Sequence, residues 1–379
     1  MQHDRALARV DLSAVRHNAA LLKERLGQGR VLCAIVKADG YGHGASWCAR
    51  AAVAGGAAWL GVATAGEAVE LRRHGFTERL LVMGALNNEE LDVTFEEELD
   101  IVVWRRPFLE MVAEKAERLE REARVHVKLD TGMGRLGTRD ADDAIELVEL
   151  TDAAGALSFT GLMTHFATAD EEDSEFFDEQ LRRFRPVAER VKRIFPRCLV
   201  HAANSAAVLR SPDAHFDMAR CGIALYGLDP FHDDAVARGL RPALTLESYV
   251  ADVKALRAGD SVGYGRTWTA PGETSIAVVP IGYGDGYRRA LSNNADVIVN
   301  GRRHPVVGTI SMDNVTVELG PDTPVSVGDR VTLIGEDGDE SVRAEELAQR
   351  IGTINYEIAC GIAPRVRRLY HRAPEMEEQ

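Results

Sequence analysis

The stretch VLCAIVKADGYGHG (residues 31–44) joins an apolar run of six residues to a lysine and three closely spaced glycines. A short apolar run that ends in a charge and in glycines is consistent with a buried β-strand. Because Lys37 follows the run directly, we expect it at the carboxyl end of that strand. Gly40, Gly42 and Gly44 allow the backbone to turn sharply there or to approach a ligand closely.

The same pattern recurs through the first 230 residues, where apolar runs alternate with Ala- and Leu-rich segments. In one such segment, 109–121, the apolar residues recur at helical spacing and share one face. Strands that alternate with helices, without tight hairpins, indicate parallel strands joined by crossover helices. The sequence shows eight such strand–helix units. This number favours an N-terminal (β/α)8 TIM-type barrel over 10–238, rather than an open doubly wound sheet. The expected strands are Val31–Val36, Ala58–Ala63, Arg79–Met83, Asp100–Val103, Val125–Leu129, Phe159–Thr164, Leu199–Ala202 and Ile223–Tyr226.

The pattern changes after Leu240, where short strand-like runs are punctuated by Gly, Pro, Asn and Asp. We expect an α/β protein in which the barrel is followed by a mainly β domain over 239–379, with one helix near Ala344–Arg350. Residues 1–9 are expected to pair with this domain, and the acidic end 375–379 to be solvated. The expected strands are Val250–Leu256, Ser275–Pro280, Asp296–Val299, His304–Val307, Asn314–Glu318 and Arg330–Ile334.

The composition restricts the compartment and the partners. The net charge of −14 comes without a basic stripe, so we expect neither nucleic acid nor an anionic membrane as a partner. The chain holds no run of about eighteen apolar residues and no apolar core near its start, which predicts neither a membrane span nor a signal peptide. Its five cysteines show no C-x-x-C spacing, which indicates reduced thiols rather than disulfides or zinc. We therefore expect a cytoplasmic protein without a bound metal.

Two places near the predicted strand ends carry groups suited to an aldehyde and to a phosphate. Lys37 alone is more often a surface charge, but a partly buried lysine amine is both a nucleophile and a base. Ser205 follows the seventh predicted strand, and Gly222 lies near the eighth, a frequent phosphate-binding location in barrels. Ser205 alone is more often a helix cap. The presence of Ser205 together with Lys37 indicates a ligand that has both a phosphate and an aldehyde.

A series of segments resembles the motifs of alanine racemases, which are fold-type III pyridoxal-phosphate enzymes. The resemblance covers essentially the whole chain and keeps the order and spacing of the motifs. Ser311 stands where other members have cysteine, and we expect little consequence because both residues are small. The segments are 34–44 (AIVKADGYGHG), 128–137 (KLDTGMGRLG), 203–205 (ANS), 220–227 (RCGIALYG), 263–265 (GYG) and 311–313 (SMD).

The resemblance implies a role for each matching position. Lys37 would carry pyridoxal 5'-phosphate covalently and act as one catalytic base, and the partner subunit's Tyr264 would act as the base on the opposite face. Lys128 matches a lysine that is carbamylated in some members, where it orients the residue matching Arg135. The remaining matches are Tyr41, Ser205, Gly222, Ile223 and Tyr356 at the phosphate, Arg220 at the pyridine nitrogen with His201 as its support, His165 near Tyr264, and Arg135 and the partner's Met312 at the substrate carboxylate.

The implied enzyme is a homodimer with shared active sites that interconverts L- and D-alanine and supplies D-alanine for peptidoglycan. Racemisation needs a base on each face of the substrate, and lysine and tyrosine have ordinary pKa values of about 10. Desolvation lowers the pKa of a lysine, whereas a tyrosine needs a positive neighbour or a hydrogen-bond donor, which His165 or an arginine could be. Arg220 stays protonated and can only donate to the pyridine nitrogen.

Other functions remain open at this point. A serine or broad-specificity amino-acid racemase shares most of these motifs. A pyridoxal-phosphate decarboxylase would normally carry an acid where this chain has Arg220, and a non-catalytic pyridoxal-phosphate carrier resembles the barrel alone. A metal hydrolase could use His43, His165 and His201, but His43 is flanked by glycines and lacks a neighbouring carboxylate pattern.

Overall fold

The computed structural model describes residues 4–171 and 173–372, which divide into two compact units. The barrel unit comprises residues 15–40 and 45–225, and the second unit comprises 4–14, 41–44 and 226–372. Residues 1–3 and the acidic end 375–379 lie outside the described residues. No helix in the described ranges is long and apolar enough to cross a membrane.

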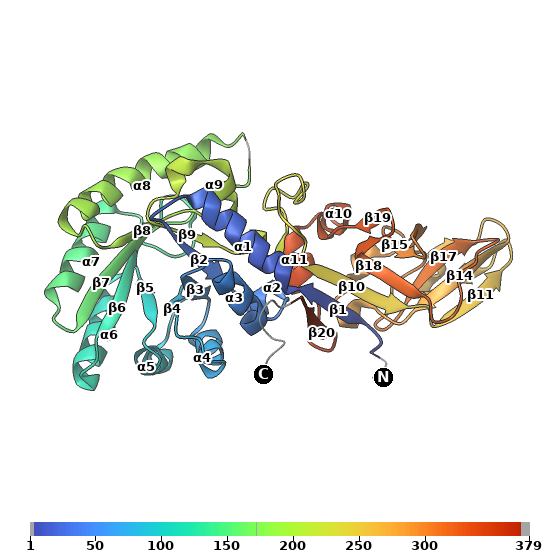
Figure 1. Ribbon diagram of the computed structural model, residues 1–379, viewed down its shortest axis with the longest axis horizontal. Coiled ribbons are helices and arrows are strands. Elements are labelled where there is room, and N and C mark those ends of the chain that lie inside the picture. Colours follow the sequence, from blue (N-terminus) through green and yellow to red (C-terminus); the bar gives the residue numbers. More distant parts are fainter. Residues whose placement is uncertain (1–3, 172, 373–379) are drawn as a thin grey trace. The chain divides into compact units, whose positions relative to one another are not determined.

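The barrel unit is a closed barrel of eight parallel strands, as predicted (Figure 1). Each strand pairs with the next along the chain, and the last returns to the first, with Val31 opposite Met218. Most strand residues are buried. Parallel strands that are covered on both faces have nearly continuous apolar sequences, which is why the pattern predicted them. The strands are β2 (Val31–Ile35), β3 (Trp59–Val62), β4 (Arg79–Val82), β5 (Asp100–Val103), β6 (Ala123–Lys128), β7 (Leu157–Met163), β8 (Leu199–His201) and β9 (Met218–Cys221).

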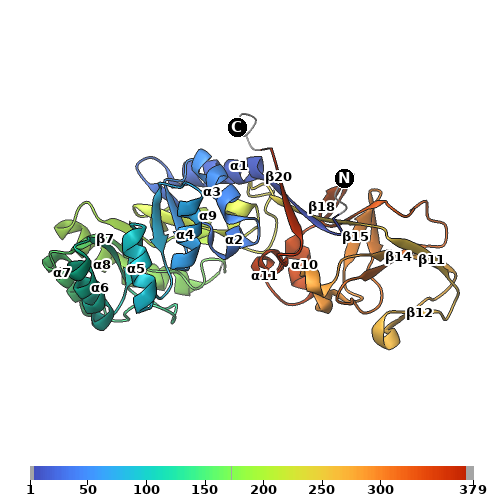
Figure 2. The same cartoon turned by 90° about the horizontal axis from the view of Figure 1, so that it is seen from below.

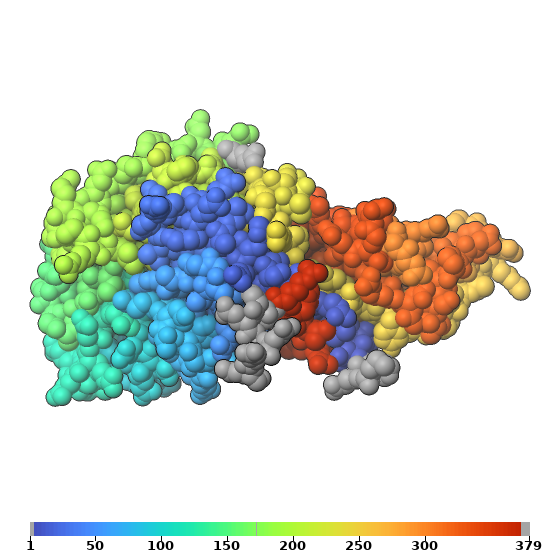
Figure 3. Space-filling model, viewed as in Figure 1, coloured from blue at the N-terminus to red at the C-terminus, as the bar shows by residue number. Residues whose placement is uncertain are grey.

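Helices surround these strands (Figure 2). On the drawn face of the barrel unit, the early segments, coloured in blues, cover one part and later segments, coloured in greens, cover the rest (Figure 3). Thr64 and Glu67 form a capping box at α4, in which each side chain accepts a hydrogen bond from the backbone amide of the other residue. In α6 the predicted apolar face is buried at Leu109, Val112 and Ala116. The helices are α1 (Leu12–Leu26), α3 (Ala45–Ala54), α4 (Ala65–Arg73), α5 (Asn88–Glu96), α6 (Arg106–Leu119), α7 (Ala141–Ala153), α8 (Glu175–Ile194) and α9 (Ser205–Arg210).

The predicted eighth strand is wrong. Ile223–Tyr226 forms a short 3-10 helix, η2, and the last barrel strand is Met218–Cys221. The run is fully buried, but a short apolar run does not distinguish a strand from a buried helical turn. Because the strand lies earlier than predicted, Arg220 belongs to the barrel wall, opposite Cys33.

The second unit is mainly β, as predicted. Its main sheet has the order β16-β15-β18-β10-β1-β20, with β19 paired to β18, and smaller sheets have the orders β11-β14-β17 and β12-β13. The predicted helix is present as α10 (Ala344–Arg350), and a further helix, α11 (Asn355–Cys360), was not predicted. The strands are β1 (Leu7–Asp11), β10 (Leu244–Tyr249), β11 (Asp252–Leu256), β12 (Ser261–Val262), β13 (Trp268–Thr269), β14 (Thr274–Val279), β15 (Asp296–Val299), β16 (Arg302–Pro305), β17 (Val315–Gly320), β18 (Arg330–Asp337), β19 (Glu340–Val342) and β20 (Arg367–His371).

Candidate active site

Lys37 follows β2 at the carboxyl end of the barrel, and the chain then turns in the left-handed conformation. The three residues after it have φ angles of 52°, 51° and 60°. Each non-glycine residue in this conformation costs roughly 1–2 kcal/mol. Side chains hold the turn: Glu67 Oε1 accepts from the Ala38 amide at 2.7 Å, and Asp39 Oδ1 accepts from the Ala45 amide at 2.8 Å. The half-buried Lys37 is therefore carried on a strained but anchored segment.

Several cations share the mouth of the barrel with Lys37. Lys128 ends β6 and is buried, Arg135 is exposed in the following loop, and Arg220 is buried in β9. Burial lowers the pKa of Lys128 to about 8, and the charges of Arg220 and Arg135 act in the same direction. Lys37 contributes more weakly to the same shift. Such a cluster is suited to a phosphate or a carboxylate, because each anion relieves the repulsion between the cations.

A carboxylate shapes the loop that leads to Arg135. Asp130 Oδ1 accepts from the amides of Gly132 at 3.0 Å and Gly134 at 3.1 Å. Gly134 has a φ of 69°, a conformation that favours glycine. The side chain of Asp130 and this glycine thus set the path of the backbone up to Arg135.

Arg220 makes four hydrogen bonds to neutral acceptors. Its guanidinium donates to the carbonyls of Thr164 at 2.8 Å and Ala202 at 3.2 Å. It also donates to Nδ1 of His201 at 2.9 Å and to Nδ1 of His165 at 3.1 Å. Burial lowers the pKa of Arg220 to about 10. Burial, followed by the charge of Arg220, also holds the pKa of both histidines well below the usual range, so both rings are neutral acceptors.

The predicted phosphate residues of the barrel unit lie together. The Ser205 hydroxyl accepts from the amides of Gly222 at 3.0 Å and Ala224 at 3.4 Å, and it is buried with Ile223. The cap of α9 is Asn204, whose side chain accepts from the third amide of the helix, so Ser205 does not serve as the cap. Ser205 is left to organise the turn after β9, where two backbone amides converge on its hydroxyl. Converging backbone amides are a common feature of phosphate-binding sites.

The second unit brings together two further predicted phosphate residues. The ring centroids of Tyr41 and Tyr356 are 6.0 Å apart, and Tyr356 lies on α11. Gly42 allows the backbone of this segment to approach the same helix, since a Cβ there would lie 2.4 Å from the carbonyl oxygen of Ala359. Its φ of 81° also favours glycine.

Tyr264 and Met312 are exposed large side chains of the second unit. Tyr264 begins the 3-10 helix η3 (Tyr264–Arg266) between β12 and β13, and it is 75% exposed. Met312 is 52% exposed in the loop before β17. The expected proximity of His165 to Tyr264 stays a prediction.

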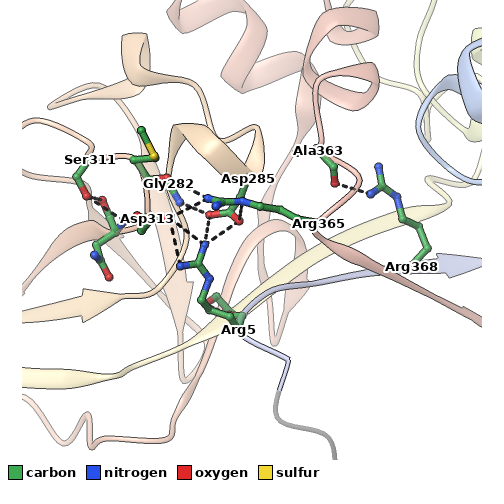
Figure 4. A network of polar contacts seen from close by, with 11 residues as sticks. Arg5, Gly282, Asp285, Ser311, Asp313, Ala363, Arg365 and Arg368 are labelled. Carbon is green, nitrogen blue, oxygen red and sulfur yellow. Dashed lines mark hydrogen bonds and ion pairs between the residues drawn. The ribbon is translucent and has the colours of Figure 1, made fainter.

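Two arginines and two aspartates hold the loop of Met312 (Figure 4). Arg365 donates to Asp313 at 3.0 Å and to the Met312 carbonyl at 3.3 Å. Arg5 donates to Asp285 at 2.9 Å and to Asp313 at 3.4 Å. The loop is therefore fixed by charged contacts although the Met312 side chain itself is exposed.

Sequence reasoning missed several residues that support these groups. Glu67 follows Thr64 at the spacing of a capping box, a signal that could have found it, and Asp130 bonds glycines two and four residues later in the same loop. The partners of His126 come from other strands, so no spacing along the chain reveals them. His201 bonds His126 through Nε2 at 2.8 Å and Arg220 through Nδ1. Since both ring nitrogens are engaged, His201 has none left for the metal ion of a hydrolase.

The chain matches two family models, described as the alanine racemase N-terminal domain over residues 10–230 and the alanine racemase C-terminal domain over residues 243–370. It is 44% identical over 367 residues to the alanine racemase of Symbiobacterium thermophilum, covering 96% of both chains. It is 39% identical over 365 residues to alanine racemase 1 of Bacillus subtilis, covering 96% of this chain and 92% of that protein.

Solved structures give the same comparison. The crystal structure of alanine racemase from the D-cycloserine-producing Streptomyces lavendulae superposes with a TM-score of 0.93 at 37% identity, covering 98% of both chains. The alanine racemase of Bacillus anthracis with bound L-Ala-P superposes with a TM-score of 0.89 at 36% identity, covering 98% of this chain and 96% of that one.

Proposed function

The chain belongs to the alanine racemase family of isomerases, and we propose that it interconverts L- and D-alanine by a two-base mechanism with pyridoxal 5'-phosphate as cofactor. The observation that carries the proposal is the set of groups at the carboxyl end of the barrel. A lysine on an anchored turn, a buried hydroxyl beside converging amides and a buried guanidinium occur there together. These groups complement an aldehyde, a phosphate and a pyridine nitrogen.

The residues of this chain fit the cofactor group by group. Lys37 would hold the aldehyde carbon, and Arg220 would donate to the pyridine nitrogen, because a guanidinium has no acceptor. When bound, pyridoxal phosphate makes the α-proton of an attached amino acid acidic enough to be removed. The residues that would hold the phosphate are Tyr41, Ser205, Gly222, Ile223 and Tyr356.

Two side chains would move the α-proton, one on each face of the substrate. We assign one face to Lys37 and the other to the partner subunit's Tyr264, so the enzyme works as a homodimer. The 75% exposure of Tyr264 within its own chain supports this assignment, since such a residue is available to a second copy. His165 accepts from Arg220 at Nδ1, so its proton lies on Nε2, from where it could donate to the tyrosine oxygen.

The substrate carboxylate would be bound by Arg135 and by the partner's Met312. Lys128 supports Arg135 in this proposal. Because its pKa is about 8, an appreciable fraction of Lys128 is the free amine near neutral pH, the form that takes up carbon dioxide. The resulting carbamate would be anionic and would orient the Arg135 guanidinium.

The cofactor assignment is tested by absorbance of the purified protein before and after borohydride. Wild-type protein should retain the cofactor permanently after reduction, whereas Lys37→Ala should lose it on dialysis. Equal retention by both proteins would contradict the role of Lys37.

The substrate assignment is tested by assaying both enantiomers of alanine and of serine as products. We expect alanine to be racemised faster, which would suit a cytoplasmic supply of D-alanine for peptidoglycan. Faster turnover of serine, or of several amino acids equally, would instead support a serine or broad-specificity racemase.

A further inference from the structure

A chain of buried polar groups runs through the barrel from Arg220 to Asp100. Arg220 Nη1 lies 2.9 Å from His201 Nδ1, and His201 Nε2 lies 2.8 Å from His126 Nδ1. His126 Nε2 lies 3.3 Å from Asp100 Oδ1. All four side chains are buried. Asp100 is the first residue of β5, whereas His201 is the last residue of β8. This series of hydrogen bonds therefore links the amino end of the barrel to the proposed cofactor site.

The direction of these hydrogen bonds follows from the chemistry of arginine. A guanidinium has donors only, so His201 Nδ1 must accept. A neutral imidazole that accepts at Nδ1 carries its proton on Nε2, and His201 therefore donates to His126 Nδ1. His126 is in turn left with its proton on Nε2, which it donates to Asp100. Each histidine thus has one allowed tautomer.

Asp100 is suited to end this chain because a carboxylate has acceptors only. Burial raises its pKa, but hydrogen bonds from His126 and Arg79 outweigh this and hold the pKa of Asp100 below the usual range. Arg79 Nε donates to Oδ2 at 2.8 Å, and Arg79 Nη2 donates to Oδ1. Thr160 Oγ1 lies 3.3 Å from Oδ1 and 3.0 Å from the Val125 carbonyl, and its one proton is shared between them. The ionised carboxylate therefore presents Oδ1 to the His126 ring.

The packing of the barrel wall leaves room for the His126 ring and holds it in place. Gly161 of β7 lies beside His126, and a Cβ at this position would lie 2.3 Å from His126 Nδ1. Trp59 packs edge-on against the same ring, with centroids 5.7 Å apart. The ring is thus held in place by packing, while its tautomer is set by its hydrogen-bond partners.

We propose that Asp100 is a positioning residue: by accepting from His126 it fixes the tautomers of His126 and His201, and so keeps an acceptor facing Arg220. Without that acceptor, the guanidinium would lose one of the contacts that aim it into the site. The consequence for catalysis rests on the proposed function, in which Arg220 faces the cofactor, whereas the consequence for the tautomers does not.

Asp100→Asn is a sharp test because the amide group cannot satisfy both of its positions. In the place of Oδ2, its nitrogen faces the Nε groups of Arg79 and Arg124, and neither can accept. In the place of Oδ1, it faces Arg79 Nη2, which cannot accept, and His126, which can accept by moving its proton to Nδ1. The Oδ1 position therefore leaves fewer opposed donors. His126 then donates to His201 Nε2, so His201 carries its proton on Nδ1, against Arg220. We call the series of hydrogen bonds from Arg220 to Asp100 the relay, and we therefore expect its bonds between His201 and Asp100 to reverse their direction in this variant.

The first measurement is NMR of the histidine ring nitrogens in cofactor-free protein labelled with the heavy nitrogen isotope. In wild-type protein, His126 and His201 should both carry the proton on Nε2 and leave Nδ1 bare. In Asp100→Asn, both should move to the Nδ1-protonated form. Wild-type rings with protons on Nδ1, or rings that do not change in Asp100→Asn, would overturn the proposal. If the variant does not fold, a wild-type ring with its proton on Nδ1 still overturns the proposal.

The second measurement compares Asp100→Asn with Thr160→Val in the cofactor-loaded enzyme. Thr160→Val removes a hydrogen bond to the same carboxylate oxygen but leaves the His126 contact, so we expect its kcat to stay near that of the wild type. For Asp100→Asn we expect kcat to fall roughly tenfold with a small change in KM, as when a group that orients a ligand-binding imidazole is lost. Equal losses in both variants would indicate a packing role and contradict the proposal.

The two measurements also separate this proposal from the proposed function. If the tautomers are as predicted but the wild-type protein racemises no amino acid, the relay stands and the proposed function fails. If wild-type activity is present but the tautomers do not respond to Asp100, the proposed function stands and the relay fails.

Discussion

Glu67 binds three backbone amides, and one of them belongs to the residue after Lys37. Its Oε1 accepts from Ala38 at 2.7 Å, and its Oε2 accepts from Ala63 at 2.8 Å and Thr64 at 3.2 Å. In Glu67→Gln, the single oxygen should take the Oε2 position, because two amides point to it. The new NH2 group then faces the Ala38 amide, and two donors oppose each other at the turn that carries Lys37.

The size of the effect follows from these contacts. A hydrogen bond to a charged acceptor contributes about 1.5–3 kcal/mol, and we take the lower end because the Ala38 amide is near solvent. The loss acts on a turn that is already strained by Ala38, Asp39 and Tyr41 at positive φ. Since about 1.4 kcal/mol corresponds to tenfold in an equilibrium constant, we expect the Kd for pyridoxal phosphate to rise roughly tenfold in Glu67→Gln.

The assay is titration of cofactor-free protein with pyridoxal phosphate, together with unfolding in urea. Thr64→Ala is the matched control, because it removes the other half of the same capping box, the bond from the Glu67 amide to Thr64 Oγ1, without touching Ala38. It should lose about 1 kcal/mol of stability and keep its cofactor affinity. If Glu67→Gln raises the Kd no more than Thr64→Ala does, the reasoning is refuted.

Three further predictions concern charge, loop anchoring and assembly. Because the pKa of Lys128 falls from 10.5 in the unfolded chain to about 8 in the folded one, unfolding takes up protons between these pH values. In buffer free of carbon dioxide, the wild type should therefore gain about 3 kcal/mol of stability over Lys128→Met between those limits; a difference that does not change with pH would contradict the burial of this charge. Arg365→Gln should raise KM for alanine by loosening the Met312 loop, while the control Arg367→Gln, which loses only a surface ion pair, should not; equal KM values would show that the anchor is dispensable. Specific activity should fall on dilution below the dimer dissociation constant, because in the proposed function each site needs the partner subunit's Tyr264, and undiminished activity in a confirmed monomer would rule this out.

Much of the fold follows from local sequence patterns. Seven of the eight barrel strands lie where apolar runs predicted them, because strands covered on both faces leave a continuous apolar signal. The helix at Ala344–Arg350 was also predicted. The place of Lys37 at a strand end also follows from the sequence, since it depends only on where the apolar run stops. The sequence motifs predicted membership of the alanine racemase family, and the comparisons confirm it.

Other features depend on which strands become neighbours. Ile223–Tyr226 has the composition of a strand, yet closure of the barrel pairs Val31 with Met218 and leaves that run as a helical turn. Asp100 and His126 carry no signal of their own, because a hydrogen bond between side chains of different strands is set by register and not by spacing along the chain. Local periodicity therefore determined the elements and the position of Lys37, whereas the closed barrel decided which buried groups bond to one another behind Arg220.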